Sequence, residues 1–194
     1  MDLVTALGRT VPLALASGIN LYATVGVLGL CARYGWVALP DQYQVFAHPV
    51  VIGVALTLYV VEFVADKVPW FDTLWDTVHT VVRPLGGAVV AVAALGQATP
   101  GMQALVAVLG GSVAMTTHLS KAGTRAVANT SPEPFSNWAL SFVEDLFAVG
   151  FSYAALQHPY LALLVSVALL TVIALSAAFL IRAVRRRFRV PRPA

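Results

Sequence analysis

The chain has 194 residues, of which 59% are hydrophobic and 11% charged, with a formal net charge of +3. Soluble domains carry about a quarter charged residues, so this composition excludes an ordinary water-soluble globule. The apolar stretches are continuous rather than alternating, which excludes a β-barrel, so we expect an all-α, polytopic bundle of membrane helices.

Six apolar stretches are long enough, or nearly so, to cross about 30 Å of hydrocarbon. Pro is well tolerated in the first turn of a helix, so the pairs His48-Pro49 and His158-Pro159 mark two helix starts. The N-terminal stretch, interrupted by Asn20, is expected to be a retained helix rather than a signal peptide. The predicted spans are 11–33, 47–66, 74–97, 102–120, 137–157 and 159–182.

These spans predict one transmembrane domain over residues 1–182 and a basic cytoplasmic tail over 183–194. The segments "HPVVIGVALTL" and "HPYLALLVSVALL" are similar, which suggests helical-hairpin repeats, although short apolar segments also resemble one another by chance. Such a thin bundle would also suit a homodimer. The single Cys31 cannot form a disulfide within the chain.

Basic residues orient the predicted bundle in a cell (inner) membrane. With six spans and a cytoplasmic N-terminus, the C-terminus is also cytoplasmic, and of the twelve basic residues only Arg33 lies outside. Six arginines lie in or next to the tail, where contact with anionic lipid headgroups is expected rather than nucleic acid. They are Arg182, Arg185, Arg186, Arg187, Arg189 and Arg192.

A polar stripe is predicted in "ADKVPWFDTLWDTVHTVVRPLGG", residues 65–87. Asp72, Asp76, His79 and Arg83 are spaced 4, 3 and 4 residues apart, which places them on one helix face. Pro84 and the two glycines after it favour a kink and a close helix contact. The alternative is an amphipathic interfacial segment whose charges reach back to water.

Other polar residues lie at depths where an unpaired charge is costly. Glu144 and Asp145 lie about 10 Å in from the inner face, counted from the start of their span. We therefore expect the polar residues to meet in the cytoplasmic half of the bundle, as an ion or substrate site or as an ion-pair lattice. The candidates are Asn20, Glu62, Asp66, Lys67, Asp72, Asp76, His79, Arg83, His118, Lys121, Arg125, Glu144 and Asp145.

Metal binding and catalysis have weaker support. Asp76 and His79 could hold zinc or a hard cation together with Glu144 or Glu62, but the neighbouring Arg and Lys side chains argue against a dense cation site. No phosphate-binding loop, G-x-S-x-G or H-E-x-x-H motif is present. The sequence leaves the cofactor, the metal and any enzymatic activity open.

Three segments carry a resemblance to a known family: "ALASGINLYATVGVLGL", "EFVADKVPWFDTLWDTVHTVVRPLGGA" and "HLSKAGTRAVANTSPEPFSNWALSFVEDLFAV". They resemble a domain-of-unknown-function family of small polytopic integral membrane proteins from bacteria and plants, with the signature A-D-K-x-P-x-x-D-x-x-W-D. The resemblance covers most of the chain before the last predicted span. It implies a shared motif and a membrane fold, and it assigns no activity.

Three functions remain open. The first is a small transporter with a cavity facing the cytoplasm, in which Asp76, His79, Glu144 and Asp145 couple to a proton or cation. Its basic residues Arg83, Lys121 and Arg125 would bind an anionic group. The second is a membrane-embedded enzyme acting on a lipid headgroup, and the third is a non-catalytic scaffold with an ion-pair core.

Overall fold

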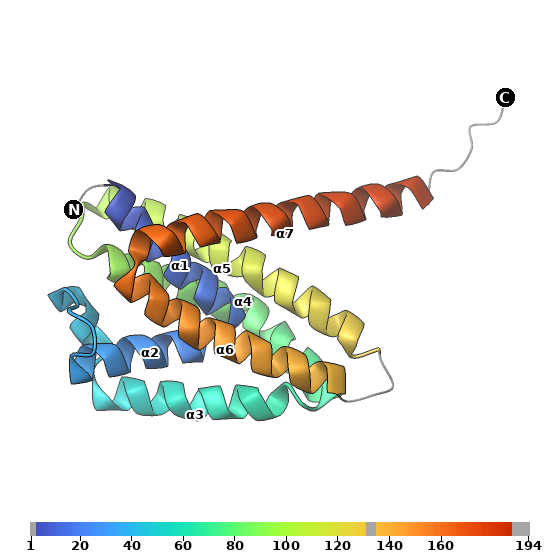
Figure 1. Ribbon diagram of the computed structural model, residues 1–194, viewed down its shortest axis with the longest axis horizontal. Helices are drawn as coiled ribbons and strands as arrows, with labels where there is room; N and C mark the ends of the chain where they lie inside the picture. Colours follow the sequence, from blue (N-terminus) through green and yellow to red (C-terminus); the bar gives the residue numbers. More distant parts are fainter. Residues whose placement is uncertain (1–2, 131–134, 188–194) are drawn as a thin grey trace.

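The computed structural model describes residues 3–130 and 135–187, and within them the chain is helical (Figure 1). Four helices are long and apolar enough to cross a membrane, and three apolar helices are shorter. The chain is thus an all-α protein with the character of a multi-pass membrane protein. In order, the elements are α1 (Leu3–Ile19), α2 (Leu21–Tyr34), η1 (Asp41–Val45), α3 (Pro49–Ala65), α4 (Pro69–Leu95), α5 (Pro100–Ala128), α6 (Phe135–Gln157) and α7 (Pro159–Arg187).

The span predicted over 11–33 is wrong, because this stretch forms two helices that meet at Asn20. Asn20 has an extended backbone, with φ −146° and ψ 101°, and its side-chain oxygen accepts a hydrogen bond of 2.9 Å from the backbone N–H of Ala23. An Asn in this position is a favourable N-cap, so it ends the first helix and starts the second. The predicted six-span arrangement and its hairpin repeats are not confirmed.

The helices α1 and α2 form a hairpin that enters the bundle and returns to the same end. Near the start of α1, the Thr5 hydroxyl lies 2.9 Å from that of Tyr160, in the first turn of α7. At the end of α2, Arg33 donates to the Ala47 carbonyl at 3.3 Å, shortly before α3 begins. We call this end of the molecule the η1 end, and the opposite end, with the turn between α3 and α4, the Lys67 end.

From the η1 end, α3 to α7 run alternately along the bundle. Helix α1 therefore begins at the η1 end, and α7 runs away from this end, so that Arg187 lies toward the opposite side of the bundle (Figure 1). The start of α1 and the end of α7 therefore lie at opposite ends of the bundle, whereas six spans would bring the first and last helices to the same end. The six-span expectation required 11–33 to cross the bundle as a continuous helix.

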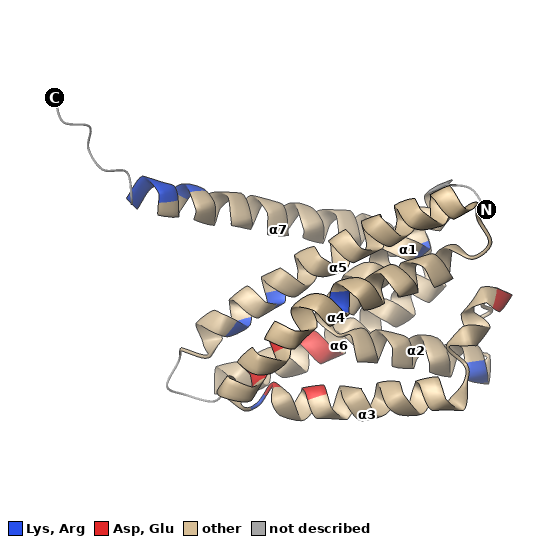
Figure 2. Ribbon diagram, turned by 180° about the vertical axis from the view of Figure 1, so that it is seen from behind, with Lys and Arg blue, Asp and Glu red and all other residues tan. Residues whose placement is uncertain are grey.

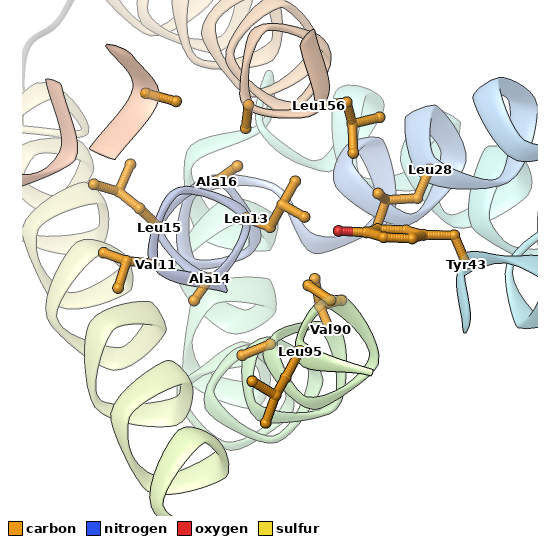
Figure 3. Packing of buried hydrophobic residues seen from close by; sticks show 14 of the residues in the cluster. Val11, Leu13, Ala14, Leu15, Ala16, Leu28, Tyr43, Val90, Leu95 and Leu156 are labelled. Carbon is orange, nitrogen blue, oxygen red and sulfur yellow. The ribbon is translucent and has the colours of Figure 1, made fainter. Parts of the chain in front are cut away.

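The core is built around α1. Leu13, Ala14, Leu15 and Ala16 are consecutive and at most 1% exposed, so the helix is enclosed on every side (Figure 3). The expected close contact of α4 is present against α5: a Cβ on Gly87 would overlap the Cβ of Ala114. Small residues at such contacts let helices approach closely enough for their backbones to pack in a membrane.

In contrast, the second half of α7 packs against little of the described chain. Of the most apolar 18-residue stretch of α7, only 6% is buried against the rest of the described chain. Leu175, Phe179 and Leu180 are each more than 60% exposed. Figure 1 shows this half diverging from α5 and α6. A helix that is apolar on all its faces and exposed suits contact with lipid.

Candidate functional site

A buried network of charged side chains lies where α3, α4, α5 and α6 approach the tip of the α1–α2 hairpin (Figure 2). It contains six of the nine acidic residues of the chain and three of its twelve basic residues. We call it the ion-pair cluster. Its members are Glu62, Asp66, Asp72, Asp76, Arg83, Lys121, Arg125, Glu144 and Asp145.

Arg83 joins α4 to α3 and α5. Its guanidinium lies 2.8 Å from Glu62 Oε1 and 3.5 Å from Asp76 Oδ1. The Arg83 and Glu62 side chains are both fully buried. Because a guanidinium can only donate, His118 Nδ1, 2.8 Å from Arg83 Nη1, must accept, so this nitrogen carries no proton.

Lys121 occupies the centre of the cluster. Its Nζ lies 3.2 Å from Glu62 Oε1, 3.6 Å from Asp66 Oδ2 and 3.4 Å from Glu144 Oε2. Three carboxylates from two helices therefore share this one ammonium group. That sharing explains how a Lys side chain only 2% exposed can remain at this depth.

Arg125 holds the part of the cluster nearest the Lys67 end. It lies 2.9 Å from the Asp66 carboxylate, 3.2 Å from Asp72 and 3.8 Å from Glu144. It also donates to the backbone carbonyls of Asp66 and Asn137, at 2.9 and 3.0 Å. These contacts tie together the turn after α3, the start of α4 and the start of α6.

The tip of the α1–α2 hairpin points into the cluster. The last carbonyls of α1 carry the negative end of its dipole, and Ile19 accepts from Lys121 at 3.2 Å while Gly18 accepts from Arg83 at 3.4 Å. The Asn20 amide donates to Asp145 Oδ1 at 2.9 Å. Carbonyls and an amide freed by a helix break thus become part of the polar site.

The two predicted histidines have separate partners. His79 lies 2.7 Å from the Trp75 carbonyl through Nδ1 and 2.9 Å from the Tyr22 hydroxyl through Nε2. His118 Nε2 lies 3.1 Å from the Thr80 hydroxyl. In the described part of the chain, no three His, Cys, Asp or Glu side chains are grouped so as to hold a metal ion. The expected set of Asp76, His79 and Glu144 is therefore not assembled as a metal site.

The cluster is short of positive charge and of hydrogen-bond donors. Counted as ionised, its six carboxylates exceed its three cations by three charges. Several buried carboxylate oxygens also have no hydrogen-bond partner among the described residues, including Glu62 Oε2, Asp66 Oδ1 and Asp145 Oδ2. Among the donors, the Nε of Arg83 likewise has no hydrogen-bond partner among the described residues. Buried oxygens of this kind lower stability unless a hydrogen-bond donor reaches them.

Two hollows adjoin the cluster. One, of about 260 Å³, lies between α1, α5, α6 and α7 and reaches Lys121 and Glu144. The other, of about 210 Å³, lies between α4 and α5 and reaches Asp72, Asp76 and Arg125. The cluster therefore separates two spaces that reach different carboxylates.

Lys67 lies at the edge of this region, in the turn between α3 and α4. Its ammonium donates to the Phe63 carbonyl at 2.9 Å and to the Ser141 hydroxyl at 3.4 Å, and it lies 3.0 Å from the centre of the Phe63 ring. Burial lowers the pKa of Lys67, although Asp145 and Asp66 act in the opposite direction. Near the η1 end, burial raises the pKa of Tyr43 to about 12.

Sequence reasoning missed several neutral partners of the site. Asn129 donates to Asp72 Oδ2 at 2.7 Å, and the Tyr22 and Thr80 hydroxyls contact the two histidines. Asn129 lies four residues after Arg125, one helical turn farther along, which was an available signal. Thr80 likewise lies four residues after Asp76, whereas for Tyr22 the sequence offered no such signal.

Residues 7–178 of the chain match the model of a protein family described as "Domain of unknown function (DUF4126)". The comparison of the chain with curated proteins found no match, and neither did the comparison with solved structures.

Proposed function

The chain belongs to the DUF4126 family, a family of unknown function, and we propose that it is a small permease whose ion-pair cluster carries protons or small cations. The observation that carries the proposal is the excess of buried carboxylates over cations at the tip of a broken helix. Ionisable groups buried in a membrane usually mark an ion or substrate path. Transporters often build such paths where discontinuous helices end inside the membrane.

The charge balance favours a positive cargo. Each basic residue of the cluster already contacts at least two carboxylates, so none is left to bind an anion. The anion-binding role expected for Arg83, Lys121 and Arg125 is therefore not part of the proposal. Protons, in contrast, would lower the excess charge and supply donors to the unpartnered carboxylate oxygens.

The two hollows supply a way for an ion to reach and leave the cluster. Glu144 adjoins one hollow and Asp76 adjoins the other. Between them, Lys121, Glu62 and Arg83 form a chain of contacts of 2.8 to 3.5 Å. Glu144 is the central carboxylate in this proposal because its side chain, 13% exposed, is the most open acid paired with Lys121. Lys121 would give one proton to Glu62 and take one from protonated Glu144, so that a proton passes from Glu144 to Glu62 and the ammonium group is restored.

In the proposed orientation the Lys67 end faces the cytoplasm and the η1 end faces outward. Five helices, α3 to α7, would then cross the membrane, with α1 and α2 as a re-entrant pair. Lys67 and the arginines at the end of α7 lie on the cytoplasmic side, as the positive-inside rule requires. Arg9 and Arg33 belong to the outer half.

Two other functions make different predictions. A metal-dependent enzyme acting on headgroups would need a third ligand beside Asp76 and His79, and the described residues supply no such group. A scaffold would use the cluster only to hold helices together. The buried contacts of Arg83 and Arg125 serve that purpose as well, so only a flux measurement separates the scaffold from the permease.

The test is proton flux into liposomes that contain the purified protein and a pH-sensitive dye, driven by a potassium diffusion potential. We expect Glu144→Gln to reduce the flux at least tenfold, because the amide cannot take up a proton, and Glu144→Asp to retain much of it. The matched control is Asp41→Asn, which neutralises an exposed acid of η1. Wild-type flux no greater than that of empty liposomes, with proton, sodium and potassium gradients each tried, would leave the scaffold as the better account.

A further inference from the structure

A lateral groove extends the hollow at Glu144 toward the lipid. It measures about 610 Å³ and lies between α5 and the diverging half of α7. The groove and the 260 Å³ hollow share Ser120, Thr124 and Ile173, so the two adjoin along α5 and α7. The residues of the lateral groove are Thr116, Leu119, Ser120, Gly123, Thr124, Val127, Ile173, Ala177 and Leu180.

This space has a polar inner end and an apolar outer part. At the inner end lie Lys121 and Glu144, with hydroxyl groups of α5 beside them. Along the groove the α7 wall is apolar, formed by Ile173, Ala177 and Leu180. The groove residues of α5 extend from Thr116 to Val127, or about 16 Å of helix, so the groove runs past Lys121 in both directions and has room for a chain of about ten carbons.

The outer part faces the surroundings of the bundle. Leu119 and Val127 of α5 are 54% and 73% exposed, and Leu180 of α7 is 62% exposed. Figure 1 shows α7 diverging from α5 on this side. In a bilayer such an opening admits molecules from the hydrocarbon region rather than from water.

The inner end of the groove could accept a further hydrogen-bond donor at Glu144. Glu144 Oε2 lies 3.4 Å from Lys121 Nζ and 3.8 Å from Arg125 Nε, and among the described residues it has no hydrogen-bond partner. A primary ammonium group carries one positive charge and three N–H donors. It would reduce the excess negative charge of the cluster and supply the missing hydrogen bond, whereas a phosphate or sulfate group would increase the excess.

We propose that the substrate of this permease is an amphiphilic organic cation, a protonated primary amine on an apolar chain, which enters from the bilayer through the lateral groove and binds with its ammonium group at Glu144. The inference rests on the proposed function and adds a substrate class and an entry route to it. A second copy of the chain is the rival occupant of the groove. It would leave the buried Glu144 oxygen without a donor, because an apolar helix face brings none.

Gly123 provides the sharpest test. It lines the groove, and a Cβ placed on it meets nothing within 4 Å, so Gly123→Leu fills the groove without disturbing the fold. The matched control is Gly150→Leu on α6, where a Cβ also meets open space outside the groove. The measurement is equilibrium binding of radiolabelled decylammonium to the purified protein in a neutral maltoside detergent.

We expect saturable binding that Gly123→Leu and Glu144→Gln each weaken at least tenfold and that Gly150→Leu leaves unchanged. Unlabelled decylammonium should displace the label, decyltrimethylammonium should be at least tenfold weaker because it has no N–H donor, and decyl sulfate should not compete. Equal competition by all three amphiphiles would overturn the proposal, and so would binding that Gly123→Leu does not affect. A change from dimer to monomer in Gly123→Leu, without amphiphile binding, would assign the groove to a second copy.

The same preparations separate this inference from the proposed function. Proton flux that depends on Glu144, without decylammonium binding, would overturn the substrate class and leave the permease in place. Binding that depends on both Glu144 and Gly123, in a protein without flux, would overturn the permease and retain the amine site.

Discussion

At the scale of single residues, the sign of the net charge in the ion-pair cluster decides which side chains are indispensable. Six carboxylates share three cations, so the loss of a cation adds to an existing excess, whereas the loss of a carboxylate relieves it. Removing one partner of a buried pair costs about 3–5 kcal/mol when it leaves a charge uncompensated. The acids and bases of the cluster should therefore respond unequally to neutralisation.

Arg125→Gln and Glu144→Gln make this inequality measurable. Arg125 is 1% exposed and contacts three carboxylates and two carbonyls, so we expect Arg125→Gln to lower the stability by about 3–5 kcal/mol. Glu144→Gln should change it by less than about 1 kcal/mol, because the lost attraction is offset by relief of the negative excess. Thermal unfolding in detergent, followed by circular dichroism, compares the two.

The double variant Arg125→Gln/Asp72→Asn supplies a control. It removes one charge of each sign, so it should recover part of the stability lost in Arg125→Gln. Equal losses in Arg125→Gln and Glu144→Gln, or no recovery in the double variant, would mean that contact geometry rather than net charge controls the stability of the cluster.

Many residues of the site could be predicted from the sequence because helical periodicity fixes which of them share a face. The spacing of Asp72, Asp76, His79 and Arg83 places them along one stripe of α4, and all four are at most 7% exposed. The partners on other helices could not be predicted in the same way. Which carboxylate faces Lys121 depends on how α3, α5 and α6 pack, and no local pattern encodes that.

At the scale of elements, the break between α1 and α2 is the feature that sequence periodicity did not predict. The apolar stretch continues through Asn20, so local preference favours one helix. The break is stabilised from elsewhere in the chain, since Arg83 and Lys121 donate to the carbonyls of Gly18 and Ile19 and Asp145 accepts from Asn20. These contacts join residues more than 60 positions apart, so they become visible only once the helices have packed.

Gly18 is the position where the tip of the hairpin comes closest to α5. A Cβ on Gly18 would overlap the hydroxyl of Thr117 and the backbone carbonyl of Ala114, and the backbone cannot move aside as a flexible side chain can. We expect Gly18→Ala to destabilise the protein by about 1–3 kcal/mol through overpacking, even though Ala is the better helix former. The measurement is again thermal unfolding in detergent.

Gly53→Ala on α3 is the matched control, because a Cβ there meets nothing within 4 Å. It should be neutral or slightly stabilising, since Ala favours a helix interior by roughly 0.5–1 kcal/mol over Gly. A Gly18→Ala protein as stable as Gly53→Ala would show that α1 does not approach α5 as closely as described.

At the scale of the whole molecule, the hairpin changes how the chain is placed in a bilayer. Composition was enough to predict helices in a membrane, and the four long apolar helices agree with it. The number of membrane crossings could not be predicted from the sequence, because a re-entrant pair of helices and a single spanning helix can have the same length and hydrophobicity. In the proposed orientation, the turn at Asn20 places the start of α1 on the opposite side of the membrane from that predicted.

Cysteine labelling in intact cells tests this placement. Cys31 is the only cysteine, and with Cys31→Ala as background, new cysteines can be placed at Gln44 of the η1 end or at Thr130 near the Lys67 end, which are both exposed. We expect a membrane-impermeant maleimide to label Gln44→Cys in intact cells and Thr130→Cys only after the cells are opened. The basic residues after α7 favour a cytoplasmic position for the Lys67 end.

A cysteine in a short N-terminal extension decides between the two topologies. If α1 and α2 return to the same side, this cysteine is labelled in intact cells together with Gln44→Cys. If residues 11–33 cross as one helix, it lies with Thr130→Cys and is protected until the cells are opened. Protection of the N-terminal cysteine would contradict the re-entrant hairpin, and with it the placement of carbonyls from a helix break at the ion-pair cluster, on which the proposed ion path depends.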